Sequence, residues 1–508
     1  MKPMLSARAY LPDLSIIARR RFLPAILLLY LAISFSLFLK WPPLWPDEAV
    51  FADTARGLLE TGRPATGLVA GLEKGAYWQA PAWYYLAAGV IALAGFEIVP
   101  LRILSAALGL IVIWLSLLLA RRAGYTRWSA HLAALLLALA PLFVLNAKLA
   151  RMDGLCMVFL LAGLLGYVAW ASTGRNPMLW LASFSFMLAV LTHPLGLIGP
   201  AVGSLHGLVA GSRRGRPGLR AVPWMIGAVL LALLLWLLVA GDPATLLLQL
   251  QYQLWRKTSS PGSHLLGFLE RYWSIPLLGI CVVAGIGWLW REVRTRPSPG
   301  STVLALAATV STTVVLVSFE LPYHIYYLPF VLPGVAGLFE WLLKRGGWVK
   351  GAGILALVAL LANLAAYTLF INYQLNLRLR AETDYRSFCR AIARELPEGA
   401  ALLINGYPTV YWGLLQQGKD FAMTEGTFLT DSLGLAVIRR VDWVVATDGF
   451  RKQGNGWDPN EQLPDVIRYA SGAGRRLVPA ATVGVAEHYA YRAWILRVTD
   501  APSPPHSP

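Results

Sequence analysis

Residues 19–48 read RRRFLPAILLLYLAISFSLFLKWPPLWPDE and place three arginines, an apolar run and an acidic pair in direct succession. The run at 22–40 is long enough to cross the hydrocarbon core of a bilayer as a helix. Positive residues beside a first span mark its cytoplasmic side, so Arg19, Arg20 and Arg21 predict a cytoplasmic N-terminus. No small-residue cleavage site follows the run, and we therefore expect a retained first span instead of a cleaved signal peptide.

The composition of the whole chain agrees with a membrane protein. Of its 508 residues, 57% are hydrophobic and 14% are charged, and the mean hydropathy is +0.56. Soluble domains average about 45–50% apolar and about 25% charged residues. These values exclude a soluble enzyme, a nucleic-acid-binding module and a disordered chain. The net charge of +17 lies mostly in short loops, where it reports topology and contact with anionic lipid.

Apolar runs separated by short polar loops continue along the chain, and eleven of them have about the length of a membrane span. They lie at 22–40, 103–120, 129–147, 154–171, 177–192, 195–210, 222–240, 273–290, 301–319, 325–342 and 352–371. The sequence therefore predicts a polytopic α-helical membrane protein with about eleven transmembrane helices.

A twelfth run, at 83–96, is short for a span, and loop charge decides how it is placed. Arginine and lysine gather at 121–127, 213–220, 291–296 and 344–350. If the short run does not cross the membrane, all four clusters share the cytoplasmic side with the N-terminus; if it crosses, all four lie outside. We therefore predict a juxtamembrane or re-entrant helix, which needs protein or a water-filled cavity beside it.

The same count places 41–102, 148–153, 241–272, 320–324 and the C-terminal tail on the outer face.

The tail differs in composition from the rest of the chain. Short β-like runs at 401–404, 443–446 and 493–496 alternate with helical stretches. We therefore divide the chain into a transmembrane module, residues 1–371, and a small extracytoplasmic α/β domain, residues 372–508.

The acidic pair Asp47-Glu48 opens an amphipathic helix at Pro46, directly after the first span. Carboxylates in the first turn of a helix are favoured by the helix dipole, and this accounts for the pair without any function. A carboxylate at the mouth of a membrane cavity can also act as a general base on a hydroxyl group. The pair alone leaves both interpretations open.

Two more polar segments are expected on the same face. Lys148-Leu149-Ala150-Arg151-Met152-Asp153 is either an interfacial turn or an arginine that holds a phosphate, with Asp153 orienting it. His324 lies among tyrosines at 323–327, which form either an aromatic belt at the membrane interface or part of a site.

In this order the segments resemble the membrane-embedded glycosyltransferases of the GT-C class, which use lipid-phosphosugar donors. The likeness is to the branch of protein O-mannosyltransferases and lipid A aminoarabinose transferases. It is carried by Asp47-Glu48, by 55–62, by Pro81-Ala82-Trp83-Tyr84-Tyr85, by Ala150-Arg151-Met152-Asp153, by Tyr326-Tyr327-Leu328-Pro329 and by the C-terminal α/β domain.

One departure from that branch concerns the donor. Relatives usually have Lys-Pro-Pro where this chain has Gln79-Ala80-Pro81, and that lysine is associated with the donor phosphate. The contact must then be remade, and Lys74 is a candidate. His324 also stands where relatives commonly carry arginine or lysine.

The resemblance implies an inverting glycosyltransferase that takes a sugar from a polyprenyl phosphate, undecaprenyl in a bacterium. It acts on a lipid, glycan or protein acceptor at the outer face of the cytoplasmic membrane, in lipopolysaccharide or protein glycosylation of the cell envelope. Asp47 or Glu48 would be the catalytic base, with Asp47 favoured. The donor phosphate would be bound by Lys74, Arg151, Asp153, His324 and Tyr327.

A divalent metal ion is a further expectation, with Asp47, Glu48 and His324 as its possible ligands. The alternative function is a transporter or flippase of lipid-linked sugars. Transporters tend to bind near the membrane midplane between internal repeats. In this chain the charges gather on one face and no repeat is evident, which favours the enzyme.

Overall fold

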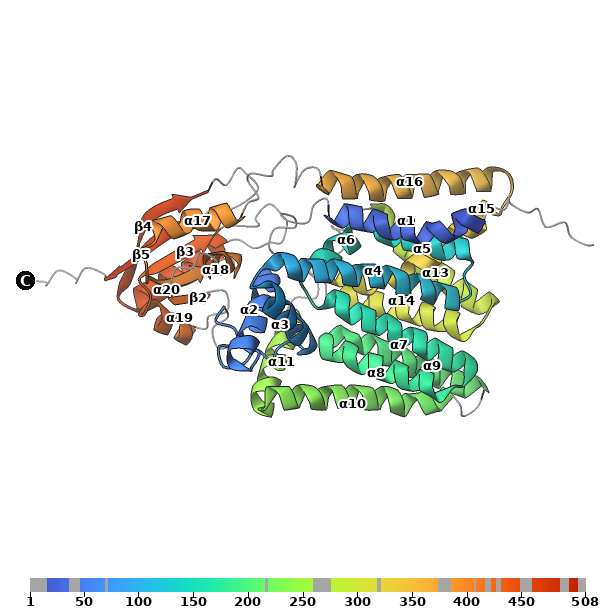
Figure 1. The fold of residues 1–508 in the computed structure, drawn as a ribbon, viewed down its shortest axis with the longest axis horizontal. Helices are drawn as coiled ribbons and strands as arrows, with labels where there is room; N and C mark the ends of the chain where they lie inside the picture. The colour runs from blue at the N-terminus through green and yellow to red at the C-terminus, as the bar shows by residue number, and fades with distance from the viewer. Residues whose placement is uncertain are drawn as a thin grey trace, which may run out of the picture.

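A computed structural model gives the fold of the chain (Figure 1). It describes residues 16–35, 46–68, 72–214, 218–258, 276–317, 321–372, 385–405, 408–415, 422–425, 431–447, 459–484 and 493–500. A bundle of helices occupies the first part of the chain, and a smaller body of strands and helices follows it. The tail positions 502–508, where the sequence becomes rich in proline and serine, lie outside the described residues.

The described residues of the eleven apolar runs lie on α- or 3₁₀-helices, apart from the break at Ala140 and the turn at Tyr327. The elements up to residue 372 are α1 (Ile16–Phe35), α2 (Pro46–Thr61), α3 (Ala82–Ala94), α4 (Ile98–Arg122), α5 (Arg127–Leu139), α6 (Pro141–Lys148), α7 (Asp153–Thr173), α8 (Asn176–Thr192), the 3₁₀ turn η1 (Pro194–Leu197), α9 (Ile198–Arg214), η2 (Gly218–Arg220), α10 (Ala221–Ala240), α11 (Pro243–Thr258), α13 (Pro276–Thr295), α14 (Pro299–Val317), η3 (Leu321–Tyr326), α15 (Leu328–Leu343) and α16 (Gly347–Asn372).

The expected number of eleven spans is not confirmed. Within the described ranges, five helices are long and apolar enough to cross a membrane, or six if the bent pair α5–α6 is one span. Five further apolar helices are shorter, with 10–17 residues, and α3 is one of them. At about 1.5 Å per residue the 13 residues of α3 reach only about 20 Å, less than the hydrocarbon thickness.

The run at 129–147 is a broken helix and not the single straight span that its composition suggests. The two halves, α5 and α6, meet at Ala140 with a bend of 64°. Pro141 explains the break, because proline has no N–H to donate and restricts the residue before it to an extended conformation. Ala140 is extended, with φ −67° and ψ 114°. The bend directs the end of α6 toward the segment that carries Arg151.

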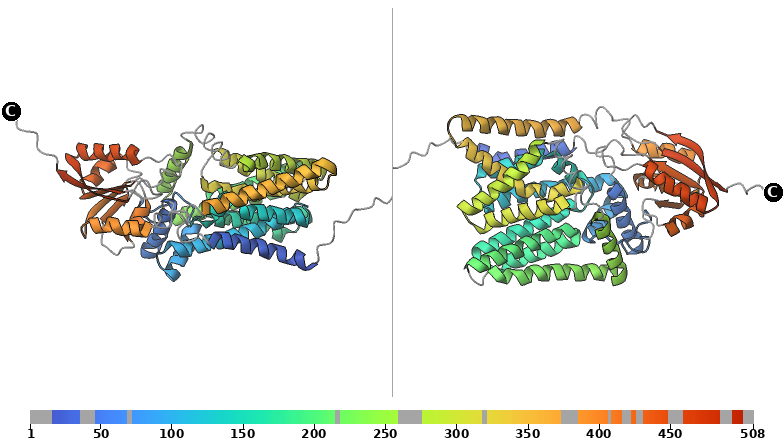
Figure 2. Two further views of the ribbon diagram at one scale, coloured as in Figure 1. Left: turned by 90° about the horizontal axis from the view of Figure 1, so that it is seen from above. Right: turned by 180° about the vertical axis from the view of Figure 1, so that it is seen from behind.

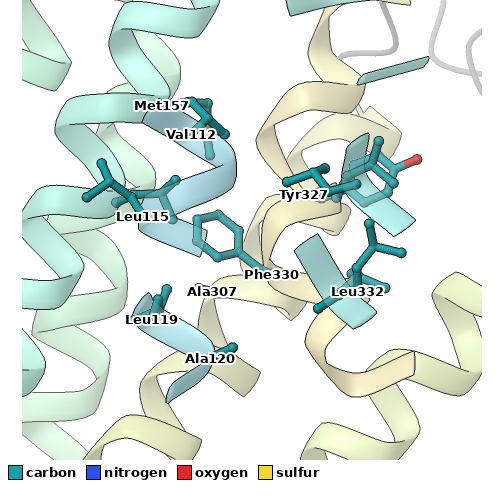
Figure 3. Packing of buried hydrophobic residues seen from close by; sticks show 14 of the residues in the cluster. Val112, Leu115, Leu119, Ala120, Met157, Ala307, Tyr327, Phe330 and Leu332 are labelled. Carbon is teal, nitrogen blue, oxygen red and sulfur yellow. The ribbon is translucent and has the colours of Figure 1, made fainter. Parts of the chain in front are cut away.

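The bundle core is apolar and closely packed. Phe330 of α15 is fully buried, and in Figure 3 its ring points toward Leu115 of α4, with Met157 of α7 and Ala307 of α14 nearby. Four helices that are distant in sequence therefore share one core.

The helices α2, α3 and α11 gather at the end of the bundle that faces the smaller body (Figures 1 and 2). Alanines and other apolar side chains of α2 face α3 and are buried, as its amphipathic sequence predicts. Glu97 precedes α4 at the same end, where the chain turns into the long helix.

The smaller body is a five-stranded mixed sheet with helices. Its elements are α17 (Tyr385–Glu395), β1 (Ala401–Asn405), α18 (Pro408–Leu415), β2 (Ala422–Glu425), α19 (Asp431–Ile438), β3 (Trp443–Thr447), α20 (Pro459–Gly472), β4 (Arg475–Val483) and β5 (Ala493–Asp500). The strand order is β2-β1-β3-β5-β4. β1 is parallel to β2 and β3, and β5 is antiparallel to β3 and β4.

Three expected strands and the helical stretches between them are present in that body, because apolar β-prone runs form the buried strands β1, β3 and β5. The two bodies are in contact. The Trp412 ring of α18 stacks on Phe96 with ring centroids 4.1 Å apart, and Arg386 of α17 pairs with Glu97 at 2.5 Å.

Candidate functional site

Arg151 lies at the centre of a charged cluster at the end of the bundle. It occupies the short turn between α6 and α7, and its side chain is 2% exposed. Nη1 forms an ion pair with the Asp47 carboxylate at the start of α2, and Nε donates to Asp153 Oδ2 at 2.8 Å. Two segments about a hundred residues apart in sequence are thereby joined by one guanidinium group.

The two adjacent carboxylates of α2 have different surroundings. Glu48 is fully buried; its Oε2 accepts from Arg102 Nη2 at 2.6 Å, and its Oε1 accepts from Arg102 Nε at 2.9 Å and from the Ala150 N–H at 2.7 Å. Asp47 remains 35% exposed beside Arg151. Glu48 therefore connects α2, α4 and the turn before Arg151. The Asp47 side chain, in contrast, is partly exposed and can contact another molecule.

Asp153 is held from a second side by the segment that precedes α15. Its Oδ1 accepts from the Tyr326 hydroxyl at 3.1 Å, and both side chains are buried. The phenol is the donor in this contact. The His193 ring lies 5.6 Å from the Tyr326 ring.

The remaining predicted site residues are His324, Tyr327 and Lys74. His324 is buried in η3, the element that carries Tyr326, and its Nδ1 lies 3.0 Å from the Tyr327 hydroxyl. Tyr327 packs in the main apolar core. Lys74 is exposed in the loop between α2 and α3. Ion pairs join Asp47, Arg151 and Asp153, and Glu48 accepts from the Ala150 N–H beside them, whereas His324 contacts Tyr327 and Lys74 is exposed in its loop.

The metal ion stays a prediction. Among the described residues, no group of three His, Cys, Asp or Glu side chains is placed to hold a metal ion. Both oxygens of Glu48 already accept hydrogen bonds from Arg102, so this carboxylate does not fit the role of a ligand in the arrangement seen. The chemistry derived below therefore uses side chains alone.

Sequence reasoning missed Arg102. It lies one residue before the predicted span at 103–120 and is 2% exposed. An ionisable residue at the edge of an apolar run was a usable signal, because a buried cation in a membrane protein needs an anionic partner.

A second missed feature lies in the loop before α3. The Trp78 and Trp83 indole nitrogens and Gln79 Oε1 are buried, and none has a hydrogen-bond partner within the described part of the chain. Buried polar atoms are nearly always paired, so an unpaired set suggests a place where a ligand supplies the partner. Trp78 and Trp83 belong to the same apolar cluster as Phe51, whose ring lies under Arg151 at 5.5 Å.

That loop is fixed by α10 and α11. The Gln249 amide accepts from the Tyr77 N–H at 2.7 Å and donates to the Gly75 carbonyl at 2.9 Å. Trp236 Nε1 donates to the Tyr77 carbonyl at 3.2 Å. The loop just before Gln79-Ala80-Pro81, where this chain departs from Lys-Pro-Pro, is thus held at Gly75 and Tyr77 by distant side chains.

Comparison with known proteins places this geometry in a family context. Residues 74–210 match the family model described as dolichyl-phosphate-mannose-protein mannosyltransferase, PMT. An uncharacterized protein from Aquifex aeolicus is 30% identical over 168 residues, which are 32% of this chain and 33% of the relative. The chain thus matches about a third of the length of that curated relative.

Two solved structures share the fold over most of the chain. ArnT from Cupriavidus metallidurans, bound to undecaprenyl phosphate, is 16% identical with a TM-score of 0.58, covering 93% of this chain and 97% of ArnT. The oligosaccharyltransferase of Archaeoglobus fulgidus, tethered to an acceptor peptide, is 12% identical with a TM-score of 0.56, covering 85% and 69%. Residues 74–210 are therefore similar to the PMT family, and most of the chain has the fold of these two structures, as the resemblance predicted.

Proposed function

We propose that this protein is a membrane glycosyltransferase that moves a sugar from a polyprenyl-phosphate carrier to a hydroxyl-bearing acceptor. The observation that carries the proposal is the contact of Arg151 with Asp47 and Asp153. It places a cation that can bind a phosphate beside the partly exposed carboxylate of Asp47. The PMT domain and the ArnT structure with undecaprenyl phosphate support a lipid-linked donor.

Asp47 is the general base in this proposal. In the free protein its charge is balanced by Arg151. When a donor phosphate takes up the Arg151 guanidinium group, Asp47 loses part of that pairing and becomes a better proton acceptor. It then accepts the proton of the acceptor hydroxyl as the hydroxyl oxygen attacks the anomeric carbon. Glu48 is excluded from this step because Arg102 and the Ala150 N–H occupy it.

Arg151 stabilises the leaving group. As the bond between the anomeric carbon and oxygen forms, the bond to the phosphate oxygen breaks and the carrier leaves as a phosphate monoester. The charge that grows on that oxygen is met by a buried, preorganised guanidinium group. Asp153, fixed by Tyr326, holds Arg151 in position through Nε, and the donor phosphate replaces Asp47 as the partner of Nη1. A single displacement of this kind inverts the anomeric centre.

The finer parts of the proposal follow the loop charge. The arginine-rich loops predict that the site faces the outside of a bacterial cytoplasmic membrane, with the N-terminus inside and the sheet domain outside. The acceptor is a lipid, a glycan or a protein. Neither the family matched nor the two structures above belongs to a transporter, and the flippase alternative therefore has no support from them.

The test uses the full-length protein with Asp47→Asn, Arg151→Ala and the control Glu60→Gln, an exposed carboxylate on the same helix. Binding is measured with undecaprenyl phosphate, and transfer with a panel of radiolabelled undecaprenyl-phosphate sugars and envelope acceptors. Asp47→Asn should lower transfer by about 10²–10⁴-fold, the usual share of a general base. It should bind undecaprenyl phosphate at least as tightly as wild type, because Arg151 loses its competing partner.

Arg151→Ala should weaken both binding and transfer, and Glu60→Gln should change neither. Near-normal transfer by folded Asp47→Asn would remove Asp47 as the base. Transfer of no sugar by wild type, with undecaprenyl phosphate unbound, would contradict the donor class itself.

A further inference from the structure

A groove between α8 and α10 lies far from the Arg151 cluster. It has a volume of about 440 Å³ and an almost wholly apolar lining. Trp180 and Phe184 of α8 form one wall, Trp224 and Leu231 of α10 form the other, and Gly227 leaves space between them. In Figure 1, α10 runs along an edge of the bundle beside α8.

This groove faces the lipid phase. Only 22% of the most apolar stretch of α10 is buried in the protein, although this helix is long and apolar enough to be a span. Trp180, Phe184 and Trp224 are each about half exposed. A side-chain groove in that position takes an apolar chain from the bilayer more readily than a polar metabolite.

The mouth of the groove is cationic. The Trp180 and Trp224 rings lie 6.3 Å apart near the starts of α8 and α10, so the two helix starts are side by side. Arg175 directly precedes α8 and Arg220 directly precedes α10, and both side chains are exposed. From Gly154 to Gly241 the sequence has five arginines and no Asp or Glu, so no carboxylate of this region neutralises them.

The mouth and the Arg151 cluster are at opposite ends of α7. Asp153 is its first residue, and Arg175 follows its last residue, Thr173, by two positions. The 21 residues of α7 extend roughly 30 Å, about the hydrocarbon thickness of a bilayer. The two cations and the tryptophan pair therefore lie at the interface opposite the proposed site, at the depth of lipid headgroups.

We infer that this groove binds one anionic phospholipid, with its headgroup phosphate between Arg175 and Arg220 and an acyl chain along Gly227. The tryptophans lie where the chain meets the headgroup, and the arginines supply the charge that selects an anionic lipid over a zwitterionic one. This site is separate from the carrier-binding cluster, and the inference does not depend on the proposed function.

The experiment is native mass spectrometry of the full-length protein released from nanodiscs that contain equal amounts of phosphatidylglycerol and phosphatidylcholine. Wild type should retain phosphatidylglycerol preferentially. Arg175→Gln with Arg220→Gln should reduce that preference about fivefold for each arginine. The matched control, Arg294→Gln with Arg296→Gln, removes the same charge at exposed positions near the end of α13 and should keep the preference.

A second variant fills the groove. A Cβ atom at Gly227 would meet no atom of its neighbours within 4 Å, so Gly227→Trp should fold with its ring in the groove and should lose one retained lipid. The control is Gly351→Trp, at a glycine of α16 that also has open space beside it, and this variant should lose no retained lipid. Equal retention of the two lipids by wild type, or the same loss of preference in the Arg294/Arg296 control, would overturn the inference. An unchanged lipid count in Gly227→Trp would remove the groove as the site.

Discussion

Asp47 and Glu48 are neighbours in sequence and carry the same chemical group, yet the fold gives them different partners. Successive residues of a helix point about 100° apart, so one carboxylate turns toward Arg102 and the other toward Arg151. The sequence predicted that the pair matters and favoured Asp47, but the basis for separating them is a contact with Arg102, 54 positions further on. No local pattern around 47–48 contains that information.

Glu48→Gln is expected to destabilise the protein. The substitution keeps the shape of the side chain but leaves the buried Arg102 guanidinium group without its anion, a change that costs about 3–5 kcal/mol in buried pairs. Thermal unfolding in detergent should show a clear loss of stability, while Glu60→Gln, which changes an exposed pair, should cost about 1 kcal/mol or less. A Glu48→Gln protein as stable as wild type would show that Glu48 does not hold α2 to α4.

Gln79→Leu should behave in the opposite way. Gln79 Oε1 is buried and makes no hydrogen bond within the described residues, so the substitution breaks no hydrogen bond of this atom. The stability of the protein should therefore stay unchanged or rise by about 1 kcal/mol. If a ligand supplies the missing partner, KM for the lipid-linked donor should rise while the protein remains folded. Wild-type KM in Gln79→Leu would place Gln79 outside the donor site.

At the scale of elements, periodicity and composition predicted where helices lie more reliably than how they are joined. Almost all described residues of the apolar runs lie on helices, because burial in a membrane and burial in a shared core require the same apolar residues. The break at Ala140 escaped this reasoning, although Pro141 is visible in the sequence. Composition alone does not say whether a proline begins a new helix or only bends an existing one.

The loop at 72–81 was expected to differ from its relatives and to supply Lys74 as a donor contact, but its supports from α10 and α11 were not predicted. Gln249→Leu removes two hydrogen bonds to the loop backbone, each contributing about 0.5–1.5 kcal/mol. Limited trypsin digestion should then cut after the exposed Lys74 faster than in wild type. Gln251→Leu, an exposed amide on the same helix, is the control and should leave cleavage unchanged. Equal rates in the two variants would mean that Gln249 does not fix this loop.

At the scale of the whole molecule, the sequence predicted a helical module and a later α/β body from their compositions. It contained no sign of how they meet, because the contacts join side chains about three hundred positions apart, Glu97 with Arg386 and Phe96 with Trp412. Phe96 follows α3 and contacts two side chains. The Arg56 guanidinium carbon lies 5.5 Å from the centre of the Phe96 ring, and the Trp412 ring stacks on it with centroids 4.1 Å apart. One aromatic ring therefore connects α2, which carries Asp47 in its first turn, with α18 of the sheet body.

Phe96→Ala should loosen the sheet body from the bundle. The substitution removes an aromatic stack, which contributes about 0.5–1.5 kcal/mol beyond its buried area, and exposes Trp412, which is fully buried in the intact protein. Hydrogen exchange at residues 408–415 should accelerate by about tenfold, while exchange within α7 stays as in wild type.

Tyr85→Ala is the control, since Tyr85 is a half-exposed aromatic residue on α3. The Glu97–Arg386 pair remains in the variant, but an exposed pair contributes at most about 1 kcal/mol and should not hold the two bodies together. Unchanged exchange at 408–415 would mean that other contacts fix α18, and that the Phe96 ring does not connect α2 to the sheet.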